Sequence, residues 1–192
     1  MNNLHQKSAV ELLKLIETKE ISSREVTQHF INRIEEVNPK LNAVVVKLYD
    51  QALKKADEAD NLQAKGESLG KLHGLPFTIK ECLDLLNTPS TLGVLARRDD
   101  RPKTNDLYVE ALQNQGGIVL GKTNVPQLMV FIECYNRVYG TTNNPHNPKF
   151  APGGSSGGEG AIVGAKASPV GIGTDIGGSV SFSGQLFAER VR

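Results

Sequence analysis

The chain has 192 residues, a net charge of +1 at pH 7 and a hydrophobic content of 39%. This length and composition allow a core of its own, and the balanced charge excludes both the basic surface of a nucleic-acid-binding protein and a polybasic membrane-binding segment. The apolar runs are far shorter than the roughly 18 residues that a membrane span requires, and the polar amino terminus shows no signal peptide. We therefore expect a globular protein of the cytoplasm or of a membrane surface, with no nucleic-acid partner and no transmembrane segment in this chain.

The cysteines and histidines do not indicate a metal site. Cys82 and Cys134 lack the CxxC or Cys/His spacing of zinc ligands, and the four histidines contain no HExxH pair. We expect no metal, no cofactor and two free thiols in a reducing compartment.

The first 65 residues predict three helices. Two pairs have the spacing of a capping box, which opens a helix: Ser8 with Glu11 and Ser22 with Glu25. Apolar residues at helical spacing follow the second pair, at Val26, Phe30, Ile34 and Val37. Because a proline disfavours helical geometry in the residue before it, we expect this helix to stop at Asn38-Pro39. Charged and alanine-bearing residues 50–65 predict a third helix with one solvated face.

Strands and helices alternate in the middle of the chain. The segment LPFTIK at 75–80 is strand-like, residues 104–115 favour a helix, and GIVLG at 117–121 is typical of a buried strand. This alternation predicts an α/β fold with a mixed, largely parallel sheet and flanking helices. We expect a single domain that is helical in residues 1–65 and α/β in residues 70–192.

A glycine-rich region follows Pro152 and contains more than half of the chain's 19 glycines. A disordered Gly/Ser linker is one interpretation, but the apolar residues inside the region favour an ordered one. We expect a helix over 159–167 and then a strand, PVGIGTD at 169–175, that leads to Ser179. Glycine fills a core poorly, yet it lets backbone N–H groups approach a ligand closely.

A nucleotide-binding protein is a rival hypothesis. Gly116, Gly121, Lys122 and Thr123 have the GxxxxGKT spacing of a phosphate-binding loop. That loop requires a strand before its first glycine, whereas YVEALQNQ favours a helix there, and the residues between the two glycines are the apolar GIVL. We therefore do not expect a phosphate-binding loop.

Ser179 is a candidate nucleophile without a GxSxG motif around it. A serine hydroxyl needs a base to take its proton, and Lys80 at the end of the apolar segment 74–80 is a candidate. Burial at a strand end would lower the pKa of this lysine and let it act as a base. The spacing leaves open the alternative that Lys80 extends into solvent.

Two segments resemble the amidase signature family of Ser-Ser-Lys amide hydrolases. They are GLPFTIKEC at 74–82 and GGSSGGEGAIVGAKASPVGIGTDIGGSV at 153–180. Similar pieces extend the resemblance over residues 8–180, and the variants KEC, SSGGEGA and TDIGGS are most similar to those of fatty-acid amide hydrolases. The amidotransferase A subunits are a less similar branch, in which Lys-Asp and DTGGS are usual.

The resemblance implies a role for each motif position. Lys80 is expected to be the base, Ser155 the bridging serine after a cis peptide bond, and Ser179 the nucleophile. The backbone N–H groups expected to form the oxyanion hole belong to Ile176, Gly177, Gly178 and Ser179. The residues expected to support them are Ser156 and Thr174 through their hydroxyls, Asp175 as an anchor of the loop, and Met129 beside the substrate.

The chain also departs from the family pattern. Ser181 and Ser183 stand where family members usually carry an arginine and a proline, residues 184–192 do not resemble the family continuation, and family chains are considerably longer. The sequence therefore resembles the amino-terminal portion of an amidase, with the sheet incomplete toward the carboxyl terminus. Two hypotheses follow: a hydrolase of small or fatty-acyl amides, which in its full-length form can be a homodimer, and a catalytically inactive remnant.

Overall fold

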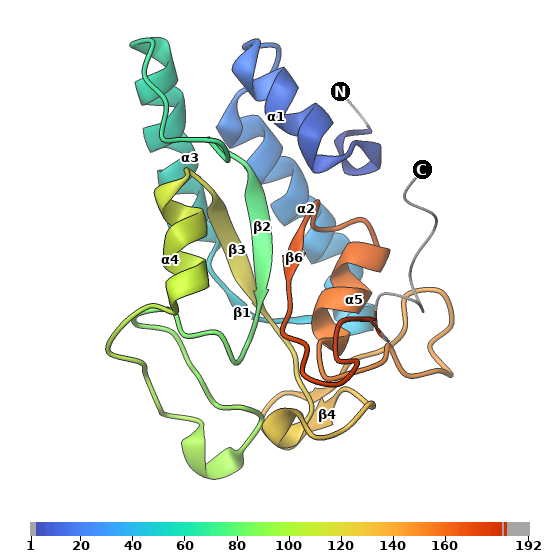
Figure 1. Cartoon of the computed structure of the whole chain (residues 1–192). Coiled ribbons are helices and arrows are strands. Elements are labelled where there is room, and N and C mark those ends of the chain that lie inside the picture. The colour runs from blue at the N-terminus through green and yellow to red at the C-terminus, as the bar shows by residue number, and fades with distance from the viewer. Residues whose placement is uncertain (1–2, 182, 184–192) are drawn as a thin grey trace.

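A four-stranded sheet forms the centre of this computed structural model, which describes residues 3–181 and 183 (Figure 1). The strand order is β1 (Val44–Lys47), β3 (Ile118–Thr123), β2 (Pro76–Lys80) and β6 (Gly171–Ile172). Strand β2 pairs in parallel with both β3 and β6, and β1 pairs antiparallel with β3. The predicted mixed, largely parallel α/β sheet is thus confirmed. A separate two-stranded ladder joins β4 (Tyr135–Asn136) and β5 (Gly140–Thr141).

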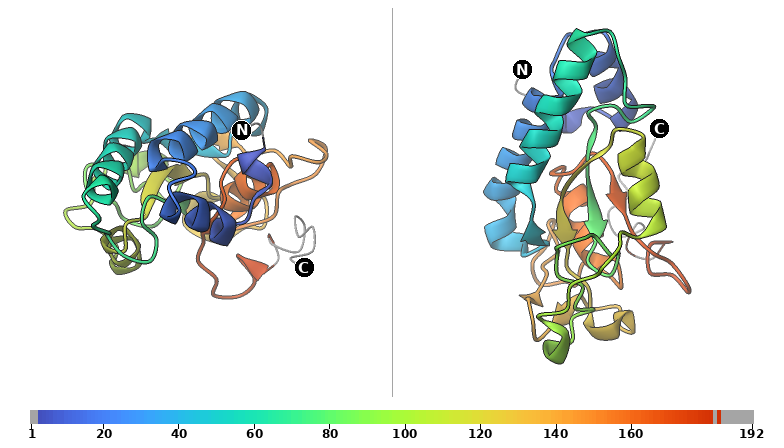
Figure 2. Two further views of the ribbon diagram at one scale, coloured as in Figure 1. Left: turned by 90° about the horizontal axis from the view of Figure 1, so that it is seen from above. Right: turned by 90° about the vertical axis from the view of Figure 1, so that its left-hand side faces the viewer.

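Helices cover both faces of this sheet. One face carries α1 (Ala9–Glu17), α2 (Ser23–Leu41), α3 (Tyr49–Ala64) and α5 (Gly157–Gly164), and α4 (Leu107–Asn114) lies on the other (Figure 2). Both predicted capping boxes are present, since the serine hydroxyl accepts the N3 amide and the glutamate accepts the serine amide in each. Short 3-10 turns lie at Leu4–Gln6, Leu95–Arg97 and Gln127–Met129.

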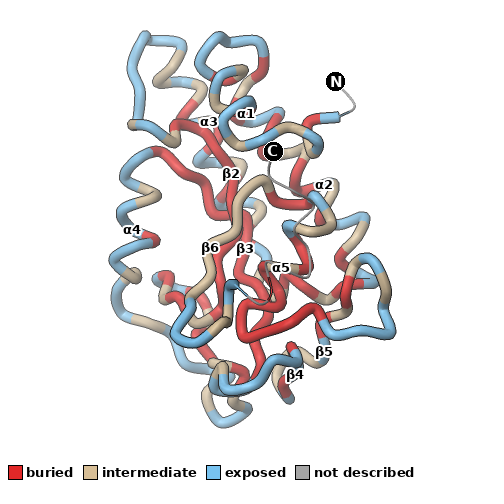
Figure 3. Tube along the Cα trace, turned by 45° about the vertical axis from the view of Figure 1, so that its right-hand side comes forward, coloured by how far each residue is buried: buried red, intermediate tan, exposed pale blue. Residues whose placement is uncertain are grey.

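The hydrophobic core is split by the sheet into two clusters, and β2 contributes differently to its two sides. Phe77 and Ile79 belong to the cluster beneath α4. Successive side chains of a strand point to opposite faces, so Thr78 and Lys80 lie on the α5 face, where both make polar contacts. The strand is buried along its whole length, as Figure 3 shows in red. One strand therefore holds an apolar row on one face and a polar row on the other.

Helix α2 corrects the expected helix end. It continues through Pro39 to Leu41 and ends with Asn42 in the left-handed conformation, whose N–H donates to the Asn38 carbonyl. The Asn38 side chain is buried and bonds the backbone of Ala43 and Val44, which ties the last turn to the start of β1. These contacts offset the backbone hydrogen bond that the proline cannot make.

Two other expectations are corrected in detail. The strand expected over 169–175 is limited to Gly171–Ile172, because the chain leaves the sheet at Gly173 and turns into the loop before Ser179. The helix expected over 159–167 spans Gly157–Gly164. The phosphate-binding loop is excluded, because residues 118–123 form the buried strand β3. Both cysteines are free thiols.

Candidate active site

Three side chains from distant segments form one continuous polar chain at the carboxyl end of the parallel strands. The Nζ of Lys80 lies 2.7 Å from the Oγ of Ser155, which lies 2.9 Å from the Oγ of Ser179. Lys80 ends β2, Ser155 lies in the loop before α5, and Ser179 lies in the loop after β6. The carboxyl ends of parallel strands meet at one edge of a sheet, which brings these three segments together. The sequence named all three residues.

Lys80 is buried and does not extend into solvent. Its side chain is 0% exposed, and its Nζ also donates to the hydroxyl of Thr174 at 2.8 Å and to the carbonyl of Thr174 at 3.3 Å. Burial lowers the pKa of Lys80, and nearby acidic groups and thiols offset part of this effect. An amine with a lowered pKa is available as a base nearer to neutral pH than an exposed lysine is.

Ser155 and Ser156 lie in the core at the start of α5. They are 3% and 2% exposed, and the peptide bond between Gly154 and Ser155 is cis. The Ser156 N–H donates to the Ser179 carbonyl at 3.1 Å, and the Ser156 hydroxyl donates to the Thr174 carbonyl at 3.3 Å. Ser156 and Thr174 therefore link this polar chain to the loop that carries Ser179.

The loop of Ser179 is wound around the carboxylate of Asp175. Its Oδ1 accepts the N–H groups of Gly178 at 2.5 Å and Ser179 at 2.8 Å, and its Oδ2 accepts those of Val180 and Ser181 at 3.0 and 2.9 Å. The Ser181 hydroxyl also donates to this carboxylate at 2.5 Å. The pKa of Asp175 is lowered well below its usual range, chiefly by that hydroxyl and then by the amides. Asp175 is thus an ionised anchor.

The four backbone amides expected in the oxyanion hole fall into two pairs. Those of Gly178 and Ser179 donate to Asp175 and are occupied in this structure. Those of Ile176 and Gly177 form no hydrogen bond with any residue in the described ranges 3–181 and 183. Ile176 is fully exposed, so this second pair is open to a substrate oxygen.

A pocket of about 550 Å³ opens beside Ser179. One wall is the glycine loop, and the other is the segment Leu128–Ile132, in which Val130, Phe131 and Ile132 are more than half exposed. Met129 lines this pocket together with its apolar neighbours, which the sequence analysis did not assign. Leu128 and Met129 have φ angles of 54° and 59°, a left-handed conformation that their residue types do not indicate.

Another group that the sequence analysis missed is Glu159, which is buried under β2 near Lys80. Its hydrogen-bond partners come from strands far away in the chain, so no local motif could reveal it. Among the residues that the structure describes, no cluster of three potential metal ligands is present. None of the described helices is both long and apolar enough to cross a membrane.

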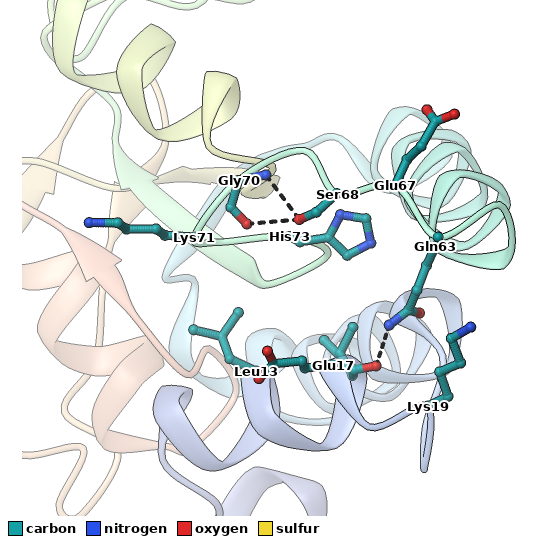
Figure 4. Close-up of a pocket in the computed structure, with 11 residues that line it drawn as sticks. Leu13, Glu17, Lys19, Gln63, Glu67, Ser68, Gly70, Lys71 and His73 are labelled. Atoms are coloured by element: carbon teal, nitrogen blue, oxygen red, sulfur yellow. Dashed lines mark hydrogen bonds between the residues drawn. The ribbon is translucent and has the colours of Figure 1, made fainter.

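Figure 4 shows a second cavity, of about 360 Å³, between α1 and the segment that follows α3. It is lined by side chains that include Leu13, Glu17, Lys19, Gln63 and His73. None of the predicted site residues lines it. The polar chain of Lys80, Ser155 and Ser179 and the pocket beside it are therefore the candidate active site.

Comparison with known proteins places this site in a family. The family described as Amidase matches residues 25–182. The chain is 43% identical over 180 residues to fatty-acid amide hydrolase 2-A of Danio rerio, covering 90% of this chain and 34% of that protein. It is 42% identical over 175 residues to an indoleacetamide hydrolase of Bradyrhizobium diazoefficiens, covering 91% of this chain and 33% of that protein.

A solved structure agrees with this assignment. The structure of a bacterial aryl acylamidase of the amidase signature enzyme family superimposes with a TM-score of 0.89 at 38% identity, over 93% of this chain and 37% of that one. The chain spans about a third of the length of the curated relatives it matches. The family match over residues 25–182 covers the strand of Lys80 and the loops of Ser155 and Ser179. The chain belongs to the amidase signature family.

Proposed function

We propose that the protein hydrolyses amides through an acyl-enzyme formed on Ser179. The observation that carries this proposal is the unbroken contact from the Lys80 amine through the Ser155 hydroxyl to the Ser179 hydroxyl. Each of these groups can give and receive a proton, so the three can move one proton along the chain. Amide hydrolysis requires such a transfer in both directions, away from the nucleophile and toward the leaving amine.

The reaction begins with Lys80 uncharged, which its burial favours. Ser155 passes its proton to Lys80 and takes the proton of Ser179, whose Oγ attacks the amide carbonyl carbon. The backbone N–H groups of Ile176 and Gly177 stabilise the charge that develops on the carbonyl oxygen, and such donors are each worth on the order of 100-fold in rate. The proton returns through Ser155 to the amide nitrogen, the C–N bond breaks and the amine leaves. Water then cleaves the acyl ester of Ser179 by the same relay.

The substrate class follows from the wall of the pocket. Five consecutive residues, Leu128–Ile132, present an apolar surface next to Ser179. Burial of apolar surface contributes about 25 cal/mol per Å², so this wall favours an apolar acyl group over a charged one. The two relatives described above are named for acyl groups of different size, a fatty acyl chain and an indoleacetyl group. We infer a substrate amide with an apolar acyl part, and no cofactor.

A second candidate is an inactive form of the same site. The amides of Gly178 and Ser179 are bound to Asp175, and the pocket wall at Ile176 is open to solvent. In that case the polar chain exists but stabilises no reaction intermediate.

A fluorophosphonate probe distinguishes the two candidates, because it reacts covalently with an activated serine. We expect the wild-type chain and the control Ser68→Ala, which changes an exposed serine outside the site, to be labelled at Ser179 as located by peptide mass. We expect Ser179→Ala to lose all labelling. Equal labelling of Ser179→Ala would remove Ser179 from the mechanism, and a folded wild-type chain that is not labelled would support the inactive form.

A further inference from the structure

Glu159 is a buried acidic residue that the mechanism above does not use. It lies in the first turn of α5 and is 5% exposed. Both of its carboxyl oxygens contact a hydroxyl: Thr78 Oγ1 lies 2.7 Å from Oε2, and Thr123 Oγ1 lies 2.8 Å from Oε1. The carboxyl group therefore joins α5 to two neighbouring strands, β2 and β3.

These two threonines place Glu159 directly beneath the catalytic lysine. Thr78 lies two residues before Lys80 on β2 and shares its face of the sheet. Thr123 lies opposite Lys80 in the register of β3 with β2. The third strand, β6, also lies against this carboxyl group, since a Cβ atom at Gly171 would overlap Oε2 of Glu159. All three parallel strands at the site thus surround one carboxyl group.

The surroundings contain no cation that pairs with this carboxyl group. No ion pair of Glu159 within 4.0 Å occurs in the described part of the chain. Among the described residues, Lys80 on β2 is the one ionisable group whose charge acts on this carboxyl group, while β3 and β6 present Thr123 and Gly171. Burial raises the pKa of Glu159 to about 8, although the two threonine hydroxyls and Lys80 act in the opposite direction. A buried carboxylate without a counter-ion is costly, and protonation removes that cost.

The hydrogen bonds around Glu159 also suit a protonated acid. If Oε1 carries the proton, it can donate to Thr123 Oγ1, and the Thr123 hydroxyl can then donate to the Ile79 carbonyl at 3.4 Å. The Thr78 hydroxyl donates to Oε2 in either state. Each polar group then has a partner without any charge in the core.

We propose that Glu159 holds a proton at neutral pH and acts as a positioning residue, which clamps β2 and β3 beneath α5 and leaves Lys80 uncharged. An ionised Glu159 would instead favour the charged form of Lys80, which cannot accept the proton of Ser155. This role rests on the proposed function of Lys80, but the protonation of Glu159 does not, so the two can be tested separately.

The pH dependence of unfolding tests the bound proton without any measurement of activity. In the folded chain Glu159 titrates near pH 8, whereas its ordinary pKa is 4.5. Folding then takes up a proton between these values, so the stability of the wild type falls as pH rises across this window. Glu159→Gln is neutral in both states and lacks this loss. The ratio of the unfolding constants of wild type and Glu159→Gln is therefore expected to rise about tenfold per pH unit inside the window.

The control is Glu133→Gln, which replaces an exposed glutamate directly after the pocket-lining segment Leu128–Ile132. This variant is expected to unfold in parallel with the wild type at every pH. Parallel curves for wild type and Glu159→Gln would overturn the proposal. Should Glu159→Gln fail to fold, the infrared spectrum of wild type with isotope-labelled glutamate decides the question. We expect the carbonyl stretch of one protonated glutamic acid at neutral pH, and its absence would overturn the proposal equally.

Discussion

The two halves of the candidate active site differ in how they are built. Lys80 and Ser155 are 0% and 3% exposed, and they sit between β2 and α5 with hydrogen bonds on several sides. Ser179 lies on a loop that also contains the fully exposed Ile176, and this loop is held mainly by the carboxylate of Asp175. The proposed base is therefore fixed by the fold of this chain, whereas the proposed nucleophile depends on a small number of local hydrogen bonds. Substitutions in the two halves should therefore differ in how much they reduce the reaction rate and the stability.

The largest effect is expected in the buried half. Lys80→Met removes the proposed base, and the rate of fluorophosphonate labelling of Ser179 should fall by about 100- to 10,000-fold. In the wild type the rate should rise with pH and level off above the lowered pKa of Lys80, because the uncharged amine is the active form. Lys80→Arg keeps a charge that cannot be lost and should be equally slow. A wild-type rate in either variant would assign the base to another group.

A smaller effect is expected from the anchor of the exposed half. Asp175→Asn keeps the shape of the side chain but replaces one of its two acceptor oxygens with a donor, so the amides of residues 178–181 can no longer all be bound. Ser179 then loses its orientation, and labelling should slow by about 10- to 100-fold.

Thermal unfolding of Asp175→Asn should change little, because the loop is exposed. The labelling rate of Asp175→Asn also shows whether the carboxylate orients Ser179 or instead blocks the neighbouring amides. A faster reaction in Asp175→Asn would mean that the carboxylate withholds the amides of Gly178 and Ser179 from the substrate oxygen.

The smallest effect is expected at the pocket wall. Phe131→Ser and Ile132→Ser remove exposed apolar side chains, so stability should stay within about 0.5 kcal/mol of wild type. For an amide with a long apolar acyl group, kcat/KM should fall about 10-fold for each change, since a lost apolar contact is worth about 1–3 kcal/mol. A short acetyl amide should be nearly unaffected. Tyr108→Ser, at an exposed position on α4 away from the pocket, is the control, and an equal loss there would contradict the assignment of the wall.

The sequence predicted the parts of the molecule that depend on local patterns or on motifs. The capping boxes predicted the starts of α1 and α2, and the motif resemblance identified Lys80, Ser155 and Ser179 as the candidate site. The predicted end of α2 was wrong. The buried Asn38 side chain forms hydrogen bonds across to β1, and these outweigh the tendency of the residue before a proline to leave the helical conformation.

The remaining parts depend on contacts between distant segments. Glu159 gained its setting from two threonines on separate strands, 81 and 36 residues away in the chain. The left-handed turn at Leu128 and Met129 contains no glycine or asparagine from which it could be predicted. The anchoring role of Asp175 was predicted, but the sequence did not show that its carboxylate binds the amides of Gly178 and Ser179, which were expected in the oxyanion hole.

Strand β2 separates its apolar and its polar side chains only because successive residues of a strand point to opposite faces of the sheet. Removing or adding a single residue between Pro76 and Lys80 would exchange the two faces, turning the lysine amine toward the cluster under α4 and a hydrophobic residue toward Ser155. Conservative replacements along this strand are therefore far safer than any change of its length, and natural variation in the number of residues should be confined to the loops on either side.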